Sequence, residues 1–302
     1  MPADTSNATA HLTPQTALLP AIHSWELYLK DQGRSIYTVK AFIGDLNLLA
    51  GYLPPDRGLG AVTTLDLNHF LGWLQKGRGV PCSPKSLARR ITSIKAFFRW
   101  LQRGGVLMND PAVKVIQQSV MSPLPAVLNQ EEVLKVVEAA NAFRLAKKPD
   151  TRPFLLLTLL LETGIKKGEC LTLTRNHIDL EAPGGPILFV RYASPSSRYK
   201  ERKINLSSDW VSAYQEYLAQ YNPPDQIFPW SPRRLEYLLE DLGSAASLDK
   251  HLSFDMCRWT CAIDDWKSGL ESDKIRQKLG VSKIQWREVS LKLRQLAGEK
   301  VS

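Results

Sequence analysis

A stretch of glycines and charged residues at positions 163–170 interrupts the most apolar part of the chain. The run 154–161 is almost wholly apolar. It is followed by Thr-Gly-Ile-Lys-Lys-Gly-Glu-Cys and then by an amphipathic segment, 171–178. Glycine commonly ends helices, so Gly164 and Gly168 around two lysines predict that one helix stops and another begins here. Taken alone, the eight residues fit a solvated corner between two helices that has no function.

Helical periodicity predicts a four-helix domain over residues 15–116. Apolar residues recur at a spacing of three or four in four segments, which cover residues 20–32, 35–52, 64–77 and 83–102. Capping signals mark their ends, for example Ser83 followed by Pro84 at the start of the fourth segment. The polar residues 1–14 are predicted to form a flexible tail, and the proline-containing residues 117–128 a linker.

The remaining residues, 129–302, are predicted to form a second domain that is mostly helical with a small β-hairpin. Residues 187–190 and 203–206 are short β-prone runs on either side of a turn rich in serine and proline. Helical patterns flank this hairpin at residues 129–137, 152–162, 207–220, 231–242, 254–269, 273–279 and 282–298. The predicted fold class is therefore mainly α.

The chain carries a net charge of +9 with a pI near 9.3, which favours a polyanionic partner such as nucleic acid. On the fourth predicted helix, cations interleave with apolar residues at Lys85, Arg89, Arg90, Lys95 and Arg99. A second basic group lies in the hairpin at Arg198, Lys200 and Arg202. Charge alone also fits a merely basic protein surface.

Four cysteines, at positions 82, 170, 257 and 261, show no Cys-x-x-Cys spacing. Cys257 and Cys261 lack further ligands at metal spacing, so we expect small buried hydrophobic residues, no metal site and no cofactor. The chain has no run of about eighteen apolar residues, and residues 1–13 lack the layout of a signal peptide. We therefore expect a cytoplasmic protein, associated with the nucleoid, that has no membrane partner.

The order of the motifs resembles that of the tyrosine recombinases, the phage-integrase and Xer-type family. After the octapeptide come Lys-Glu-Arg at 200–202, Leu-Ser-Phe-Asp-Met-Cys-Arg at 252–258 and Lys-Leu-Gly-Val at 278–281. The first domain resembles the SAM-like core-binding domain of this family, with an aromatic phrase at 97–101 and Asn-Asp-Pro-Ala at 109–112. The resemblance spans residues 17–298. It implies a core-binding domain followed by a catalytic-type domain.

Recombinases of this family cut DNA without a metal ion. Two arginines grip the phosphate, a hairpin lysine protonates the leaving oxygen, histidines assist, and a tyrosine attacks the phosphorus. The resemblance puts these residues of the present chain at those positions: Lys166 for the first arginine, Lys200 or Ser197 for the lysine, Asp255 and Val281 for histidines, Arg258 for the second arginine and Ser290 for the tyrosine. No tyrosine follows Tyr237.

We therefore expect a DNA-binding protein on the recombinase scaffold that acts in or regulates DNA recombination or integration and does not cleave DNA. Arg258, together with the cations of the fourth helix and the hairpin, is expected to contact phosphates of double-stranded DNA. Two alternatives stay open. One is a divergent active recombinase that uses Lys166, Lys200 and Arg258, with its nucleophile elsewhere or supplied in trans. The other is a protein-interaction module without DNA binding.

The last predicted helix offers a means of association. Family members exchange a C-terminal segment between neighbouring protomers on DNA, and residues 282–298 present Trp286, Val289 and Leu293 at helical spacing. An exchanged helix would join copies of this chain, or join the chain to a recombinase partner. Folding back onto its own domain fits the same pattern equally well.

Overall fold

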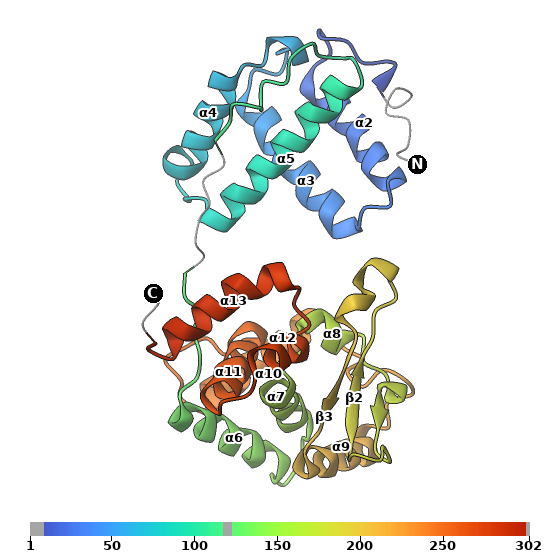
Figure 1. The fold of residues 1–302 in the computed structure, drawn as a ribbon, viewed down its shortest axis with the longest axis vertical. Helices are drawn as coiled ribbons and strands as arrows, with labels where there is room; N and C mark the ends of the chain where they lie inside the picture. The colour runs from blue at the N-terminus through green and yellow to red at the C-terminus, as the bar shows by residue number, and fades with distance from the viewer. Residues whose placement is uncertain (1–8, 117–122, 300–302) are drawn as a thin grey trace. The chain divides into compact units, whose positions relative to one another are not determined.

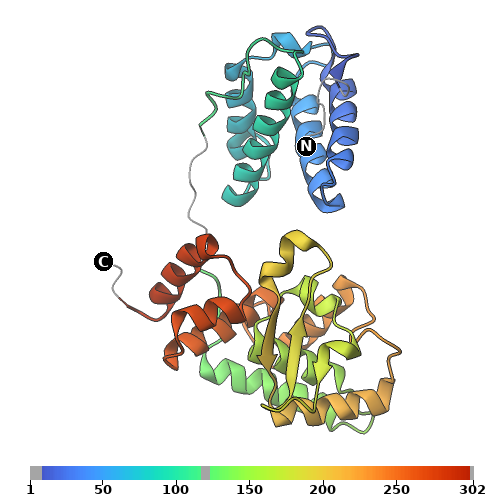
Figure 2. The same ribbon diagram turned by 45° about the vertical axis from the view of Figure 1, so that its right-hand side comes forward.

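The computed structural model describes residues 9–116 and 123–299. The chain forms two compact units, with the boundary between Pro123 and Leu124. That boundary falls within the segment predicted as a linker, of which residues 117–122 lie outside the described part. Figures 1 and 2 show the ribbon of each unit. Each unit encloses a hydrophobic core of its own.

The first unit contains the four predicted helices. They are α2 (Leu18–Asp31), α3 (Ile36–Tyr52), α4 (Thr64–Gly72) and α5 (Pro84–Arg103), with short helical turns η1 (Leu59–Ala61) and η2 (Trp73–Gly77). Ser35 and Ser83 cap α3 and α5 by accepting a backbone N–H three residues further on. The third helix was predicted to reach Gly77, but its α-helical part ends at Gly72 and a π-turn continues it.

Residues 9–14 correct the prediction of a flexible tail over residues 1–14. Thr9 is only 2% exposed, and its hydroxyl donates to the Gly104 carbonyl at 3.1 Å. Leu12 is buried in the core of the first unit, and the Pro14 carbonyl accepts the Gly60 N–H at 2.7 Å. The polar composition hid these contacts, because one leucine and a few hydrogen bonds suffice to hold so short a segment.

The second unit packs its helices around α7 (Arg152–Thr163), which contacts α6 (Gln130–Arg144), α9 (Ser208–Tyr221), α10 (Pro232–Ala245) and α11 (Phe254–Lys267). A three-stranded antiparallel sheet in the order β1-β2-β3 lies beside these helices. The hairpin β2–β3 was predicted. Strand β1 was not, because two residues are too few to show alternation. The elements are α6 (Gln130–Arg144), α8 (Lys167–Leu171), η3 (Arg175–His177), β1 (Ile178–Asp179), β2 (Ile187–Val190), η4 (Pro195–Lys200), β3 (Arg202–Asn205), α9 (Ser208–Tyr221), α10 (Pro232–Ala245), α11 (Phe254–Lys267), α12 (Ser272–Lys278) and α13 (Lys283–Leu296).

The predicted corner is present at residues 163–170. Helix α7 ends at Thr163, Gly164 adopts a left-handed conformation with φ of 59°, and α8 begins at Lys167. A Cβ atom on Gly164 would lie 3.0 Å from the Leu279 side chain and 3.3 Å from the Cys261 sulfur. The corner is therefore packed against α11 and the end of α12, and a side chain at Gly164 would be both strained and crowded.

Helix α13 packs onto its own unit. Leu293 is completely buried, and Trp286 and Val289 pack against a small cluster that contains Ile263 and Leu279. The sequence left open whether residues 282–298 are exchanged between protomers or fold back onto their own domain. In the single chain they fold back. This cluster is separate from the main core of the unit and much smaller.

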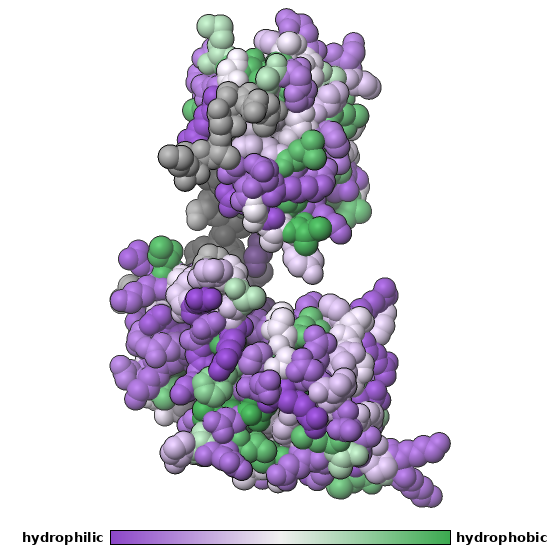
Figure 3. All heavy atoms as spheres, turned by 90° about the vertical axis from the view of Figure 1, so that its right-hand side faces the viewer, coloured by the Kyte–Doolittle hydropathy of each residue, from purple (hydrophilic) through white to green (hydrophobic). Residues whose placement is uncertain are grey.

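Hydrophilic side chains cover most of the face that each unit presents in Figure 3. Cys257 and Cys261 are buried, as predicted. Within residues 9–116 and 123–299, no helix is both long and apolar enough to cross a membrane.

Candidate active site and nucleic-acid interface

The carboxylate of Glu169, on α8, is the centre of a buried polar cluster. It accepts hydrogen bonds from the Arg202 guanidinium at 2.8 and 3.0 Å and from the Lys166 backbone N–H at 2.8 Å. The Tyr192 hydroxyl also donates to it. Burial alone would raise the pKa of Glu169. The hydrogen bonds and charge of Arg202, together with the hydrogen bonds from the Lys166 backbone and Tyr192, outweigh that effect and lower the pKa of Glu169 to about 2.

Sequence reasoning missed Glu169. Its signal was available, because a glutamate at the third position of a helix can accept the N–H of the capping residue, here Lys166. The pairing of the buried Glu169 carboxylate with Arg202 of β3 depends on the tertiary fold, so no local sequence pattern could predict it.

Arg202 lies in the interior, which corrects the expectation that it contacts DNA. Its side chain is 6% exposed. Besides Glu169, it donates to the carbonyls of Lys278 at 2.6 Å and Lys200 at 3.1 Å. A Cβ atom on Gly280 would lie 2.6 Å from its guanidinium, so only glycine fits beside it. Arg202 therefore ties β3 to α8 and to the end of α12.

Lys166 and Arg258 line one cavity of about 630 Å³, together with Asp255 at the start of α11. The Lys166 ammonium donates to the Gly280 carbonyl at 3.2 Å and lies 3.7 Å from Glu169. Burial lowers the pKa of Lys166 to about 8. Glu169 opposes this shift, and the charges of Arg258, Arg202 and Lys200 add to it. The positive charges of Arg258, Arg202 and Lys200 therefore all act on the Lys166 ammonium.

Arg258 uses its guanidinium to hold backbone carbonyls. It donates to Gly164 and, at 2.6 Å, to Leu279, so it joins α11 to the corner and to the end of α12. Burial lowers the pKa of Arg258. The resemblance expects a phosphate-binding arginine at position 258. In this structure Arg258 is partly buried and holds the corner and the end of α12 in place.

The same cavity also contains acidic side chains. Asp255, Glu236 and Glu240 line it, and Glu236 accepts a hydrogen bond from Lys167 at 2.5 Å. Carboxylates near Lys166 and Arg258 reduce the positive potential that a phosphate would meet.

Val281 and Ser290 are not among the described residues that line this cavity. Val281 packs against the small cluster under α13. The Ser290 hydroxyl, within α13, donates to the Arg287 carbonyl at 3.3 Å. The structure therefore brings together Lys166, Asp255 and Arg258 and leaves the predicted nucleophile position in a helix-internal contact.

Lys200 stands at the end of η4, with its ammonium 5.2 Å from the ring centre of Tyr199 and 5.7 Å from that of Tyr192. Arg198, on the same turn, is exposed. Of the three cations predicted in the hairpin, Arg198 and Lys200 thus lie outside the buried cluster around Glu169, and Arg202 lies within it.

The predicted cations of α5 divide into two groups. Lys85 and Arg99 are exposed and Lys95 is half-buried. Arg89 and Arg90 instead turn to the buried carboxylate of Asp45, at 2.7 and 3.4 Å. The Arg90 side chain is only 12% exposed, so the expectation that it contacts DNA does not fit its position.

Asp45 explains why these two arginines point inward. Its carboxylate also accepts a hydrogen bond from Ser93 at 2.8 Å. Burial raises the pKa of Asp45 despite the opposing hydrogen bond of Ser93 and the charges of Arg89 and Arg90. A buried acid on α3 cannot be paired with arginines on α5 from sequence spacing alone.

Two family models match this chain. The phage integrase N-terminal SAM-like domain matches residues 22–105, and the model described as the phage integrase family matches residues 126–287. The chain belongs to the phage integrase family. The predicted resemblance to tyrosine recombinases is thereby confirmed.

Relatives identified by their sequences agree with this assignment. Tyrosine recombinase XerC of Mycobacterium tuberculosis is 36% identical over 148 residues, which are 49% of each chain. Tyrosine recombinase XerD of Listeria innocua is 27% identical over 193 residues, 64% of this integrase-family chain and 62% of XerD. The chain therefore spans about half the length of the XerC relatives that it matches.

The fold of this integrase-family chain is similar to that of a lambda integrase dimer bound to a COC' core site. The TM-score is 0.72 at 16% identity, over 99% of this chain and 82% of the other. A XerH recombinase bound to a palindromic difH substrate gives 0.70 at 16% identity, over 97% and 93% of the two chains. The predicted fold class, a SAM-like helical domain followed by a mostly helical catalytic-type domain with a small sheet, is confirmed.

Proposed function

We propose that this integrase-family chain binds duplex DNA and acts in or regulates DNA recombination without cutting a strand itself. The observation that carries the proposal is the nucleophile position. It holds Ser290, whose hydroxyl donates to a carbonyl of its own helix. A serine hydroxyl is a weak nucleophile unless an adjacent base takes its proton.

The cations around Lys166 support the same conclusion. A guanidinium can donate two parallel hydrogen bonds to a phosphate, whereas the Lys166 ammonium is a point charge that already donates to Gly280. Position 258 has the arginine that the resemblance expects, but the Arg258 guanidinium already donates to two backbone carbonyls. Asp255 adds a negative charge to the cavity. Each feature weakens the stabilisation of a transition state that gains negative charge.

DNA binding requires cations at the surface, and two elements provide them. Helix α5 presents Lys85, Lys95 and Arg99, and the turn η4 presents Arg198 and Lys200. Contacts from such side chains go mainly to phosphates, so they position a protein on DNA without reading its sequence. Each neutralised phosphate releases counterions and makes the affinity fall as the salt concentration rises.

Two measurements on the full chain test this proposal. A mobility-shift titration should show binding to duplex DNA that weakens steeply with added salt. DNA that gives a shift is then nicked near its centre and incubated with the chain, and the mixture is run on a denaturing gel. We expect no covalent protein–DNA band.

The possible outcomes separate the proposal from its alternatives. A covalent band that disappears in Ser290→Ala would show that Ser290 is a nucleophile. A band that persists in that variant would show a divergent recombinase with another nucleophile. Failure to shift any duplex at low salt would favour a protein-interaction module and overturn DNA binding.

A further inference from the structure

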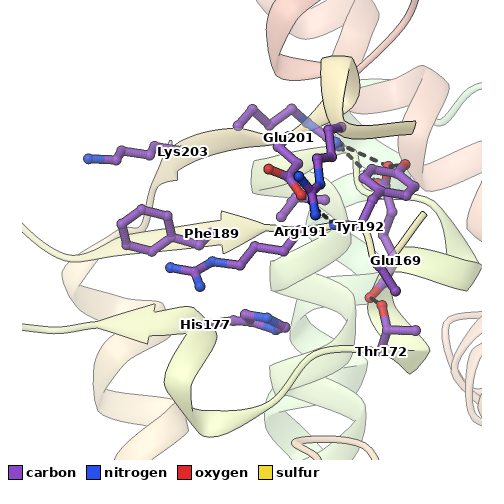
Figure 4. Close-up of a pocket in the computed structure, with 12 residues that line it drawn as sticks. Glu169, Thr172, His177, Phe189, Arg191, Tyr192, Glu201 and Lys203 are labelled. Atoms are coloured by element: carbon purple, nitrogen blue, oxygen red, sulfur yellow. Dashed lines mark hydrogen bonds and ion pairs between the residues drawn. The ribbon is translucent and has the colours of Figure 1, made fainter. Parts of the chain in front are cut away.

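The outer face of the small sheet carries a row of cationic and aromatic side chains. Side chains alternate between the faces of a strand, so Phe189 and Arg191 share the face opposite the buried Val190. The register pairs Phe189 with Lys203 of β3. In Figure 4 the Phe189 ring lies between Lys203 and Arg191, and His177 of η3 lies beyond Arg191.

The Phe189 ring holds the two cations apart. The Lys203 ammonium is 4.9 Å and the Arg191 guanidinium 5.2 Å from the ring centre, which is cation–π distance for both. Both cationic side chains are exposed, and the ring is half-buried. The arrangement fixes two positive charges on the sheet without neutralising either.

These cations differ from the buried Arg202. In the described part of the chain, no carboxylate lies within ion-pairing distance of Arg191, Arg198 or Lys203. The nearby carboxylate of Glu201 accepts the Tyr192 backbone N–H at 2.9 Å, and Glu169 belongs to Arg202. The face therefore keeps an excess of positive charge.

His177 adds a hydrogen-bond donor to the row. Its Nδ1 accepts the Thr174 backbone N–H at 3.1 Å, so the neutral ring carries its proton on Nε2. Burial and the charge of Arg191 lower the pKa of His177, which keeps the ring neutral at physiological pH.

These residues line a cavity of about 900 Å³. That volume lies within the range of about 300–1,000 Å³ that is typical of ligand sites and exceeds what one phosphate group fills. The lining combines Phe189 and Val190 with the cations, so it offers apolar contact and positive charge side by side.

We propose that this pocket binds an acidic peptide segment of a partner protein, with at least two carboxylates over Arg191 and Lys203. Charge complementarity favours an anionic occupant, and the concave shape favours flexible side chains over the rigid, convex backbone of a DNA duplex. An unstacked base would find the Phe189 ring already covered by the two cations. The site is distinct from the cations on α5 and shares only Arg198 with the turn η4 that is proposed to contact DNA, so peptide binding goes beyond the proposed DNA binding.

The test compares three forms of the full chain by fluorescence anisotropy. The probes are a labelled short peptide of alternating glutamate and glycine, the same peptide with glutamine, and a labelled DNA duplex. The pocket variant is Arg191→Glu/Lys203→Glu. The matched control, Lys147→Glu/Lys148→Glu, makes the same change of charge at two exposed lysines.

We expect the glutamate peptide to bind the wild type more tightly than the glutamine peptide. The pocket variant should weaken that binding by about ten-fold or more, because two attractions become two repulsions. The control should change it by less than about two-fold, since its charges lie elsewhere. Duplex affinity should be the same in the pocket variant and the control.

Three results would overturn the proposal. Equal binding of the two peptides to the wild type would remove the acidic specificity. Parallel loss of peptide and duplex binding in the pocket variant would assign the pocket to the DNA surface. Self-association of the wild type that the pocket variant abolishes would identify a second copy as the occupant. The milder variant Arg191→Gln/Lys203→Gln keeps the test decisive if charge reversal prevents folding, as checked by circular dichroism.

Discussion

Arg202 and Glu169 form a two-pronged ion pair between β3 and α8, with nitrogen–oxygen distances of 2.8 and 3.0 Å. The side chains are 6% and 3% exposed, so the pair is almost wholly removed from water. Because Arg202 also donates to Lys278 and Lys200, the pair holds the hairpin, the octapeptide corner and the end of α12 together.

Removing one partner of this pair should destabilise the second unit strongly. Arg202→Met leaves the Glu169 carboxylate buried without its main donor, and such changes typically cost about 3–5 kcal/mol. Urea unfolding of the variant, followed by circular dichroism, measures the loss against Lys147→Met as an exposed control. A difference below about 1 kcal/mol between the two variants would contradict the structural role of Arg202.

The same pair predicts a defined sensitivity to acid. The pKa of Glu169 is lowered from 4.5 to about 2, so its contribution to stability is fully present above pH 4.5 and is lost as the pH falls towards 2. A shift of this size corresponds to about 3 kcal/mol. Stability measured between these pH values should fall less in Glu169→Gln than in the wild type. Parallel curves for both proteins would show that other carboxylates cause the acid sensitivity.

Much of the fold could be predicted from the sequence, because its helices carry strong local signals. Asn129 and Glu132 form a capping box at the start of α6, and Gly164 ends α7. The site was harder to predict, since its contacts join distant segments. Arg202 and Arg90 looked like surface cations, and only the folded chain shows that each turns towards a buried carboxylate.

The division of cations on α5 predicts two different mutant phenotypes. Lys85→Ala/Lys95→Ala/Arg99→Ala should weaken duplex binding and reduce the slope of log affinity against log salt by roughly 2.7 if all three contact phosphates. The stability of the variant should stay close to that of the wild type, because these side chains are exposed or half-buried.

Arg89→Ala/Arg90→Ala should instead lower stability by removing both cations from the buried Asp45. Salt titrations by anisotropy and urea unfolding of both variants separate the two effects. An unchanged salt slope in the triple variant would exclude this face of α5 as a phosphate contact.

If a DNA phosphate enters the cavity beside Lys166, the affinity for DNA should depend on the charge of this side chain. Its pKa is lowered to about 8, so its positive charge is present below that pH and lost above it. A bound phosphate favours the charged form, so the midpoint on DNA should lie at or above 8. The affinity difference between the wild type and Lys166→Met should therefore shrink as the pH rises from 7 to 10. A difference that stays constant over this range would show that Lys166 does not contact DNA as a cation.

Restoring the tyrosine alone should not restore cleavage. Ser290→Tyr supplies the nucleophile that the resemblance requires, but Lys166, Asp255 and Val281 still occupy positions of an arginine and two histidines. Catalytic groups act as a unit, so one replaced member gains little while the others are missing. Incubation with nicked duplex that the protein binds should give no covalent band for Ser290→Tyr, and Ser290→Phe controls for the added ring. If Ser290→Tyr alone forms the band, the remaining site is sufficient for transition-state stabilisation, and the missing tyrosine is the only barrier to cleavage.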